Sequence, residues 1–345
     1  MTTTAQQRSA DLDTRLRAHP DRFRVLTGDR PTGRLHLGHY FGTLHNRVRL
    51  QRLGVPLHLV IADYQVITDR DTAEHLDEHV EELLLDYYAA GLDPERCTPF
   101  THSAVPALNQ LMLPLLSLVS LPELHRNPTV KDEITHSRQA SVNGLMLTYP
   151  VHQAADILFC GANVVPVGQD QLPHLELTRT LARRFNDRYA PVFTEPEALL
   201  SPAPLVLGTD GTKMSKSRGN AIHLADTPDR TAQLLRGATT DSQRHITYEP
   251  DTRPEIASLL LLASLCTGQD PHRIAEDLGS AGAAALKNTV TDAVNTHLAP
   301  LRARRAELAQ DRTHLRRLLR EGNARARDHA ENTLDQVRTA MGTRY

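Results

Sequence analysis

Two histidines three residues apart lie where a buried strand is expected to lead into a helix. Residues 32–39 read TGRLHLGH, which places His36 and His39 around Gly38. Free N–H groups at a helix N-terminus favour a bound anion, two imidazoles can donate to phosphate oxygens, and a glycine lets a nucleotide ring approach the backbone. The pattern indicates a phosphate-binding site, although two surface histidines on an ordinary helix would give the same spacing.

A second stretch whose residues could take part in catalysis is KMSKS at residues 213–217, which holds two of the four lysines of the chain. Three glycines, Gly208, Gly211 and Gly219, flank it. Two ammonium groups on a glycine-hinged loop can close over a triphosphate and neutralise a departing pyrophosphate. We prefer this interpretation to a solvated basic turn, because so specific a string is not expected by chance.

Short apolar runs that alternate with helical patterns predict the elements that position these motifs. We expect strands over residues 23–27, 56–61, up to about 100, and 163–167, and helices over 38–53, 72–90, 105–121, 145–159 and 171–186. This order predicts an α/β fold with a parallel sheet covered on both faces, whose ligands bind at the carboxyl ends of the strands. A linker is expected over residues 195–220, and only helical patterns follow residue 227.

The composition narrows the class of protein further. With 40% apolar and 23% charged residues in a chain of 345, a globular protein of about two domains is expected, with no membrane-spanning run. A net charge of −2 argues against a general polyanion binder, and no DNA partner is expected. Three widely spaced cysteines favour a reducing cytoplasm. No metal site is expected, because His75 and His79 have no evident third ligand.

The two motifs, in this order and at this separation, resemble the signatures of class I aminoacyl-tRNA synthetases. Further strings, GDRPTGRLHLGHYFG at 28–42, YPVHQAADIL at 149–158, VPVGQDQ at 165–171 and HLELTR at 174–179, are similar to the tryptophanyl-tRNA synthetase family over nearly the whole chain. The resemblance implies a Rossmann-like catalytic domain over residues 1–225 and an all-helical anticodon-binding domain over 226–345, whose last helix packs back on the first. It also implies ATP with Mg²⁺, L-tryptophan, tRNA-Trp and a homodimer.

The same resemblance carries functional residues over to this chain. Asp156 matches the carboxylate that accepts the indole N–H, which suits a group that can only donate. The residues implied as catalytic are His36, His39, Lys213 and Lys216. Those implied at ATP are Arg30, Pro31, Thr32, Gly38, His39, Lys131, Gly168, Gln169, Asp170, Lys213, Met214, Ser215, Lys216 and Ser217. Those implied at tryptophan are Leu26, Arg30, Gln65, Tyr149, Gln153, Asp156 and Gln171.

Three of the residues implied at the tryptophan site differ from those most common in the family. Leu26 stands where an aromatic residue is frequent, Arg30 replaces a neutral amide, and Gln65 replaces a histidine. The departures resemble an auxiliary bacterial branch and predict resistance to indole-like inhibitors such as indolmycin. We expect Arg30 to clamp the tryptophan carboxylate through a charge-assisted pair.

Two other functions remain open at the level of sequence. A tyrosyl-tRNA synthetase shares the fold and a similar Tyr, Gln and Asp arrangement, although the AAD and VPVGQDQ strings favour tryptophan. The second alternative is a paralogue that binds or adenylates tryptophan without charging tRNA. The intact HLGH and KMSKS motifs indicate that adenylation is retained, but they do not show that tRNA is charged. The basic end of the chain, with eleven arginines after residue 300, is expected to face tRNA or to form a solvated helical face.

Overall fold

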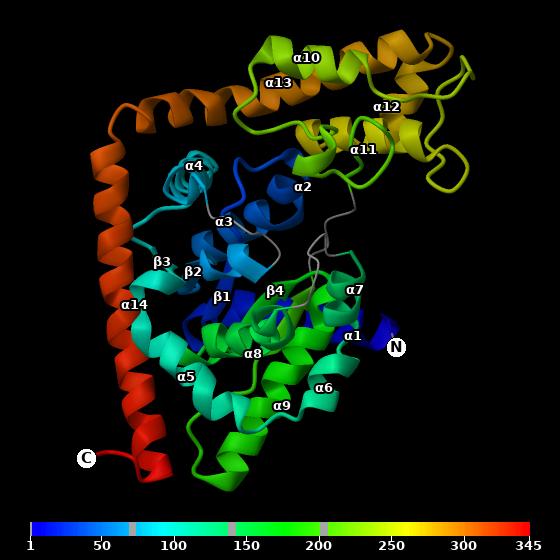
Figure 1. Ribbon diagram of the computed structural model, residues 1–345. Coiled ribbons are helices and arrows are strands. Elements are labelled where there is room, and N and C mark those ends of the chain that lie inside the picture. Colours follow the sequence, from blue (N-terminus) through cyan, green and yellow to red (C-terminus); the bar gives the residue numbers. More distant parts are fainter. Residues whose placement is uncertain (1, 69–73, 137–142, 201–205) are drawn as a thin grey trace.

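The computed structural model describes residues 2–68, 74–136, 143–200 and 206–345. Five parallel strands form a sheet in the order β3-β2-β1-β4-β5 (Figure 1). The strands are β1 (Val25–Asp29), β2 (Leu57–Ile61), β3 (Cys97–Thr101), β4 (Val164–Val167) and β5 (Glu197–Leu200). The first four follow the predicted order, whereas the prediction of a linker from residue 195 is wrong at β5. This edge strand is short and only partly buried, so it lacks the apolar, β-branched run that marks a central strand.

Helices cover both faces of this sheet, as the alternation of strands and helices predicts. They are α1 (Thr2–Ala18), α2 (Leu37–His39), α3 (His45–Arg52), α4 (Leu76–Ala89), α5 (Pro106–Leu116), α6 (Leu121–Arg126), α7 (Pro128–His136), α8 (Gly144–Phe159) and α9 (Leu172–Arg188). The helix predicted over 38–53 is divided by one π-helical turn, Tyr40–Leu44. The predicted start of α4 at residue 72 lies outside the described residues. Polar α1 was not predicted as a helix, and it buries Leu12 and Leu16.

The carboxyl ends of the strands separate at the centre of the sheet. β1 pairs with β2 over five residues, but it pairs with β4 only through Val25 and Val164 at its start. The strand order also reverses at β1, since the chain turns from one side of the sheet to the other there. A crevice at such a point is where open parallel sheets bind ligands. Gly28 is required beside it, because a Cβ there would lie 1.9 Å from the carbonyl oxygen of Val60.

The remainder of the chain is helical. It forms α10 (Pro228–Arg236), α11 (Pro254–Thr267), α12 (Pro271–Leu278), α13 (Ala283–Leu308) and α14 (Arg312–Met341). α13 continues through Pro300 and α14 through Gly322, although both residue types disfavour the interior of a helix. Figure 1 shows α14 running along the side of the α/β part. No helix among the described residues is both long and apolar enough to cross a bilayer.

Candidate active site

The two motif histidines meet at the carboxyl end of β1. His36 precedes the first turn of α2 and is 6% exposed, and the His36 and His39 ring centroids lie 3.7 Å apart. The backbone N–H of His36 donates to Nδ1 of His39 at 3.4 Å. Because Nδ1 accepts, the neutral ring of His39 carries its proton on Nε2, where it can be donated to a ligand.

Both imidazoles are held in the neutral form. Burial, followed by the positive fields of His39, Lys216 and His223, lowers the pKa of His36 to about 3. Burial lowers the pKa of His39 to about 4, with Asp29 opposing this shift. Near pH 7 the pair therefore offers hydrogen-bond donors without a fixed charge, and a phosphate would favour protonation where its charge develops.

A buried ion pair fixes the loop on which these histidines stand. Asp29, at the end of β1, accepts from Arg47 Nη1 at 2.5 Å and from the Tyr87 hydroxyl at 2.6 Å. Arg47 also donates to Thr27 at 3.0 Å. Arg47 holds the pKa of Asp29 well below its ordinary value, although burial would raise it. The charges of Asp29 and Arg47 neutralise each other. The two residues therefore position the loop, and the Asp29 carboxylate is not available to a ligand.

The KMSKS loop contacts the same region. The Lys216 ammonium donates to the carbonyl of Gly33 at 2.7 Å and to the Thr32 hydroxyl at 3.3 Å. Buried Met214 lies beside Gly38, where an added Cβ would sit 3.7 Å from the Cβ of Met214. The strand-like segment that follows the loop bridges to the histidines, since the Leu37 N–H donates to the carbonyl of Ile222. The second motif thus lies directly against the first.

Asn220 organises this loop from within and is only 3% exposed. Its side chain donates to Asp210 at 2.8 Å and accepts from the Ser215 N–H at 2.9 Å. A Cβ at Gly208 would lie 2.4 Å from the Asn220 side chain, so that glycine is needed for packing. The backbone of Lys213 forms a β-bridge to Leu207, and its side chain is exposed. Lys213 therefore does not share the position of Lys216.

The indole-acceptor candidate Asp156 is buried on α8, with 2% exposure. Its Oδ1 lies 3.0 Å from Nε2 of His102, a fully buried residue directly after β3. Nδ1 of His102 lies 3.9 Å from Asp63, which follows β2. His102 and Asp63 are not among the residues predicted from the sequence. Their position after the carboxyl ends of predicted strands could have indicated a place at the site.

Other candidate residues line the same edge of the sheet. The Tyr149 hydroxyl lies 2.9 Å from Nε2 of His174, whose burial lowers its pKa to about 4. Tyr149, Gln153 and Asp156 share a face of α8, because they are spaced four and three residues apart. The Gln171 amide donates to the Asp170 carboxylate at 3.0 Å.

The remaining candidates are spread around this edge. Leu26 is buried in β1, and Arg30, Gln65 and Gln153 are partly exposed. Pro31 is buried, whereas Gly168, Gln169, Asp170 and Lys131 are exposed. Ser217 belongs to a short 3₁₀ turn, Lys216–Arg218, and its side chain lies outside the described residues.

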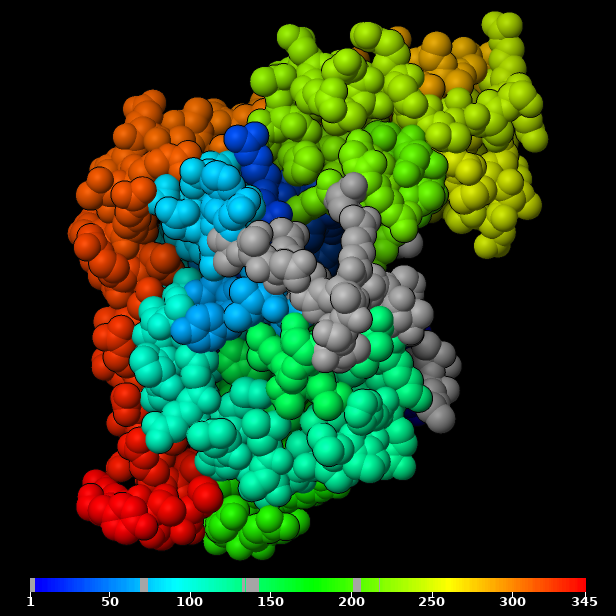
Figure 2. Space-filling model, in the orientation of Figure 1, coloured from blue at the N-terminus to red at the C-terminus, as the bar shows by residue number. Residues whose placement is uncertain are grey.

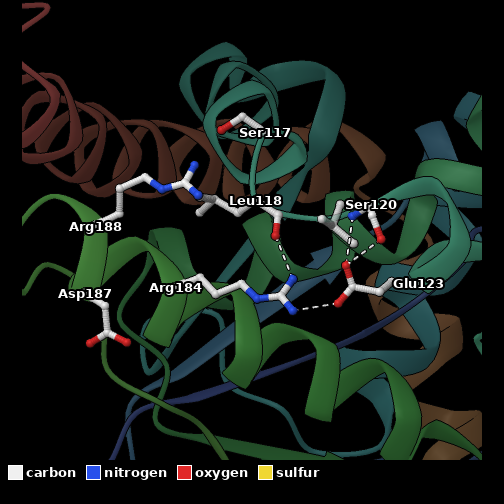
Figure 3. A pocket seen from close by; sticks show the side chains of 8 residues that line it. Ser117, Leu118, Ser120, Glu123, Arg184, Asp187 and Arg188 are labelled. Carbon is white, nitrogen blue, oxygen red and sulfur yellow. Dashed lines mark hydrogen bonds and ion pairs between the residues drawn. The ribbon is translucent and has the colours of Figure 1, made fainter.

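A separate groove lies away from these residues, between α5, α6 and α9 (Figure 3). Two of its charged groups bind each other, since Arg184 donates to Glu123 at 2.6 Å, and Arg184 also donates to the carbonyl of Leu118 at 2.7 Å. The groove is open and holds neither motif. We therefore place the active site at the carboxyl ends of the strands.

A parallel sheet that carries paired imidazoles and a lysine loop in contact at the carboxyl end of β1 is the arrangement of a class I aminoacyl-tRNA synthetase. The family model described as tRNA synthetases class I (W and Y) matches residues 19–299, and the chain belongs to this family.

Relatives refine this assignment. Tryptophan–tRNA ligases of Treponema pallidum and Clostridium longisporum are 41% and 40% identical, over 92% and 93% of this chain and 96% and 97% of theirs. The tryptophanyl-tRNA synthetase of Campylobacter jejuni, solved with ADP and tryptophan, superposes with a TM-score of 0.81 at 28% identity, covering 92% of this chain and 99% of that one. Within the family, this chain groups with the tryptophanyl-tRNA synthetases.

Proposed function

We propose that this chain activates L-tryptophan with ATP and transfers it to tRNA-Trp, as a tryptophan–tRNA ligase. The observation that carries the proposal is the contact of Lys216 with the histidine loop after β1, on the edge of the sheet where Asp156 contacts His102 directly after β3. The relatives at about 40% identity over nearly their whole length support the same activity.

The reaction needs no nucleophile from the protein. The tryptophan carboxylate attacks the α-phosphorus of ATP, the bond to the β-phosphate oxygen breaks, and pyrophosphate leaves. A ribose hydroxyl at the end of the tRNA then attacks the adenylate carbonyl, and AMP leaves. Orientation of the two substrates and stabilisation of negative charge supply the catalysis.

The ATP half of the site is proposed at the histidine and KMSKS loops. Neutral His36 and His39 donate to phosphate oxygens, and Lys216 neutralises charge on the departing pyrophosphate. Lys213, now exposed, joins when the triphosphate fills the crevice. Mg²⁺ would enter on the ATP phosphates, because Asp29 is already occupied by Arg47 and Tyr87.

The tryptophan half is proposed along α8 and the ends of β1 and β2. Asp156 accepts the indole N–H, Tyr149 and Gln171 hold the α-amino group, and Arg30 pairs with the carboxylate. A buried acceptor of this kind rejects a phenyl side chain, which would leave the carboxylate unpaired. Leu26, Gln65 and Gln153 complete the pocket wall in this proposal. Leu26, Arg30 and Gln65 differ from the residues common in the family, and this difference is the basis for expecting tolerance of indolmycin.

The chain contains no tryptophan, which provides a direct binding assay. Added tryptophan is the sole indole in solution, and its emission shifts on transfer into an apolar pocket. We expect Asp156→Ala to weaken this binding at least tenfold, because the indole N–H loses its buried acceptor. Unchanged affinity would rule out the assignment of Asp156.

The two alternatives are tested by different assays. ATP/pyrophosphate exchange with tryptophan and with tyrosine separates the two synthetase activities. Charging of tRNA-Trp separates a ligase from a paralogue that stops at the adenylate, and repeating it with indolmycin tests inhibitor resistance.

Assembly is part of the proposal as well. We expect a homodimer in the cytoplasm, and exposed Leu113 on α5 and Leu121 on α6 are the apolar side chains available for such a contact. We propose the anticodon-binding part at residues 226–345; α10 to α13 lie above the sheet in Figure 1, and Figure 2 shows these helices, yellow-green to orange, along the top of the molecule.

A further inference from the structure

A histidine bridges two carboxylates beneath the proposed tryptophan pocket. His102 is fully buried, with Nε2 3.0 Å from Asp156 Oδ1 and Nδ1 3.9 Å from Asp63 Oδ1. His102 opens the 3₁₀ turn His102–Ala104 after β3, Asp156 lies in α8, and Asp63 follows β2 by two residues. The fold therefore brings together three groups that no local sequence pattern connects.

The two carboxylates differ in how the protein holds them. Asp63 accepts from the N–H groups of Tyr64 at 3.0 Å and Ser103 at 3.2 Å, and also binds the Ser103 hydroxyl. Among the described residues, His102 is the one basic side chain within 4.0 Å of the Asp156 carboxylate, and the angles at this contact are those of an ion pair and not of a hydrogen bond. The orientation of Asp156 therefore depends on His102, which Asp63 in turn supports.

The electrostatics of the bridge agree with its geometry. Burial would lower the pKa of His102, but Asp156 and Asp63 together raise it above its ordinary value. A positively charged imidazole attracts both carboxylates and so fixes the Asp156 oxygen that faces it. An ionised carboxylate is purely an acceptor, which is the form that an indole N–H requires.

The surrounding groups do not replace His102. His152, on α8, lies with its ring centroid 4.4 Å from that of His102, and its Nε2 contacts the amide oxygen of Asn109 at 2.8 Å. Burial lowers the pKa of His152, so it supplies no positive charge. The donor atoms of His102, His152 and Asp156 lie within 4.8 Å of one another, close enough to share a metal ion. The 3.0 Å contact is a hydrogen-bonding distance, and we interpret it as an ion pair.

We propose that His102 is a positioning residue for tryptophan recognition: it holds one oxygen of Asp156, so that the other oxygen accepts the indole N–H. The proposal rests on the proposed role of Asp156 and extends it to the residue that sets its orientation and charge. His102 then contributes to specificity through the carboxylate, without contacting the substrate itself.

The test compares tryptophan with β-(3-benzothienyl)alanine, in which sulfur replaces the indole N–H. We expect His102→Asn, whose shorter side chain cannot reach Asp156, to weaken tryptophan binding roughly tenfold to a hundredfold and to leave the analogue almost unchanged. His102→Gln keeps a donor near the position of Nε2 and should stay within about threefold of the parent. The Michaelis constant for ATP should not change in either variant.

Controls separate the possible failures. His125→Asn, at an exposed position of α6, should change neither ligand. Asp156→Ala, which removes the acceptor, should abolish the preference for tryptophan over the analogue; if it does not, the proposed function of Asp156 fails. If Asp156→Ala abolishes the preference but folded His102→Asn keeps it, the role of His102 is wrong. Should the Asn variant not fold, loss of the preference in folded His102→Gln would overturn the proposal, and retention would support it.

Discussion

The histidines of the active site differ in protonation because they differ in neighbours. His36 and His39 face Lys216 and His223, so burial and positive fields keep them neutral. His102 faces two carboxylates, which raise its pKa in spite of complete burial. The same side chain therefore provides a neutral phosphate donor in one part of the crevice and an imidazolium in another.

Lys216 is the residue whose charge the proposed mechanism needs most. Lys216→Met keeps much of the aliphatic stem but removes the ammonium that neutralises pyrophosphate. We expect kcat for ATP/pyrophosphate exchange to fall by about 10²–10³, with tryptophan affinity unchanged, because the lost interaction forms in the transition state. Stopped-flow exchange measurements would show this. Lys287→Met is the control, and an equal loss in both variants would exclude the role of Lys216.

Residues within a motif could be predicted from the sequence, whereas their supports could not. His36, His39, Lys213 and Lys216 stand in strings whose chemistry is local, and Tyr149, Gln153 and Asp156 have helical spacing. Arg47, Asn220, His102 and Asp63 act across elements far apart in the chain. Their positions depend on the strand order and on how β1 and β4 separate, which a single sequence does not specify.

Among the elements, those with strong periodicity were predicted and those defined by context were not. β2 and β4 are largely apolar runs, but β5 is a short edge strand and α1 is a polar helix stabilised by what it covers. α13 keeps its course through Pro300, where the residue type predicts a break. Packing overrides local propensity at each of these places.

The contact between α14 and β3 is the element-level feature most open to test. A Cβ at Gly322 would lie 2.0 Å from the carbonyl oxygen of Pro99, and the Asn323 amide oxygen accepts from the Thr101 N–H at 3.0 Å. Gly322→Ala would favour an isolated helix, yet here the overlap must separate α14 from the sheet. We expect a loss of about 1–3 kcal/mol in the free energy of unfolding by urea.

Gly144→Ala serves as the matched control for that substitution. A Cβ at Gly144, the first residue of α8, meets nothing within 4 Å. The control should be neutral or slightly stabilising. If both alanine variants unfold at the same urea concentration as the parent, the tight fit of α14 against β3 is not a source of stability.

At the scale of the whole molecule, the arginine-rich end mainly fastens the chain to itself. Arg305 pairs with Glu82 and Asp86, and Arg312 with Glu81 and Glu82, which joins α13 and α14 to α4. Nine of the eleven arginines after residue 300 form hydrogen bonds or ion pairs within the described part of the chain, namely Arg302, Arg305, Arg312, Arg316, Arg317, Arg325, Arg327, Arg338 and Arg344. The charge excess thus has a structural use besides any contact with tRNA.

Buried neutral histidines should make the molecule sensitive to mild acid. Burial, then His329 and two arginines, lowers the pKa of His58 to about 3, and both of its ring nitrogens lack a hydrogen-bond partner. The unfolded chain binds a proton near pH 6.5 and the folded chain does not, so stability falls as the pH drops from 6.5 towards 4.5. His58→Leu should lessen this fall by at most about 1.4 kcal/mol per pH unit in urea titrations. An unchanged slope would contradict the assignment.

Dimerisation gives the last test at this scale. Leu113 and Leu121 have 68% and 63% exposure, unusual for leucines in a chain whose other large aliphatic side chains are mostly covered. In a homodimer that buries them, a charge at either position would have to be desolvated without a partner. The double variant Leu113→Glu, Leu121→Glu should therefore sediment as a monomer at concentrations where the parent is a dimer. Arg320→Glu, at an exposed position of α14, is the control. It adds a carboxylate elsewhere on the surface and should leave the sedimentation coefficient unchanged. A parent that is itself monomeric, or a double variant that stays dimeric, would show that the two leucines do not form the subunit contact.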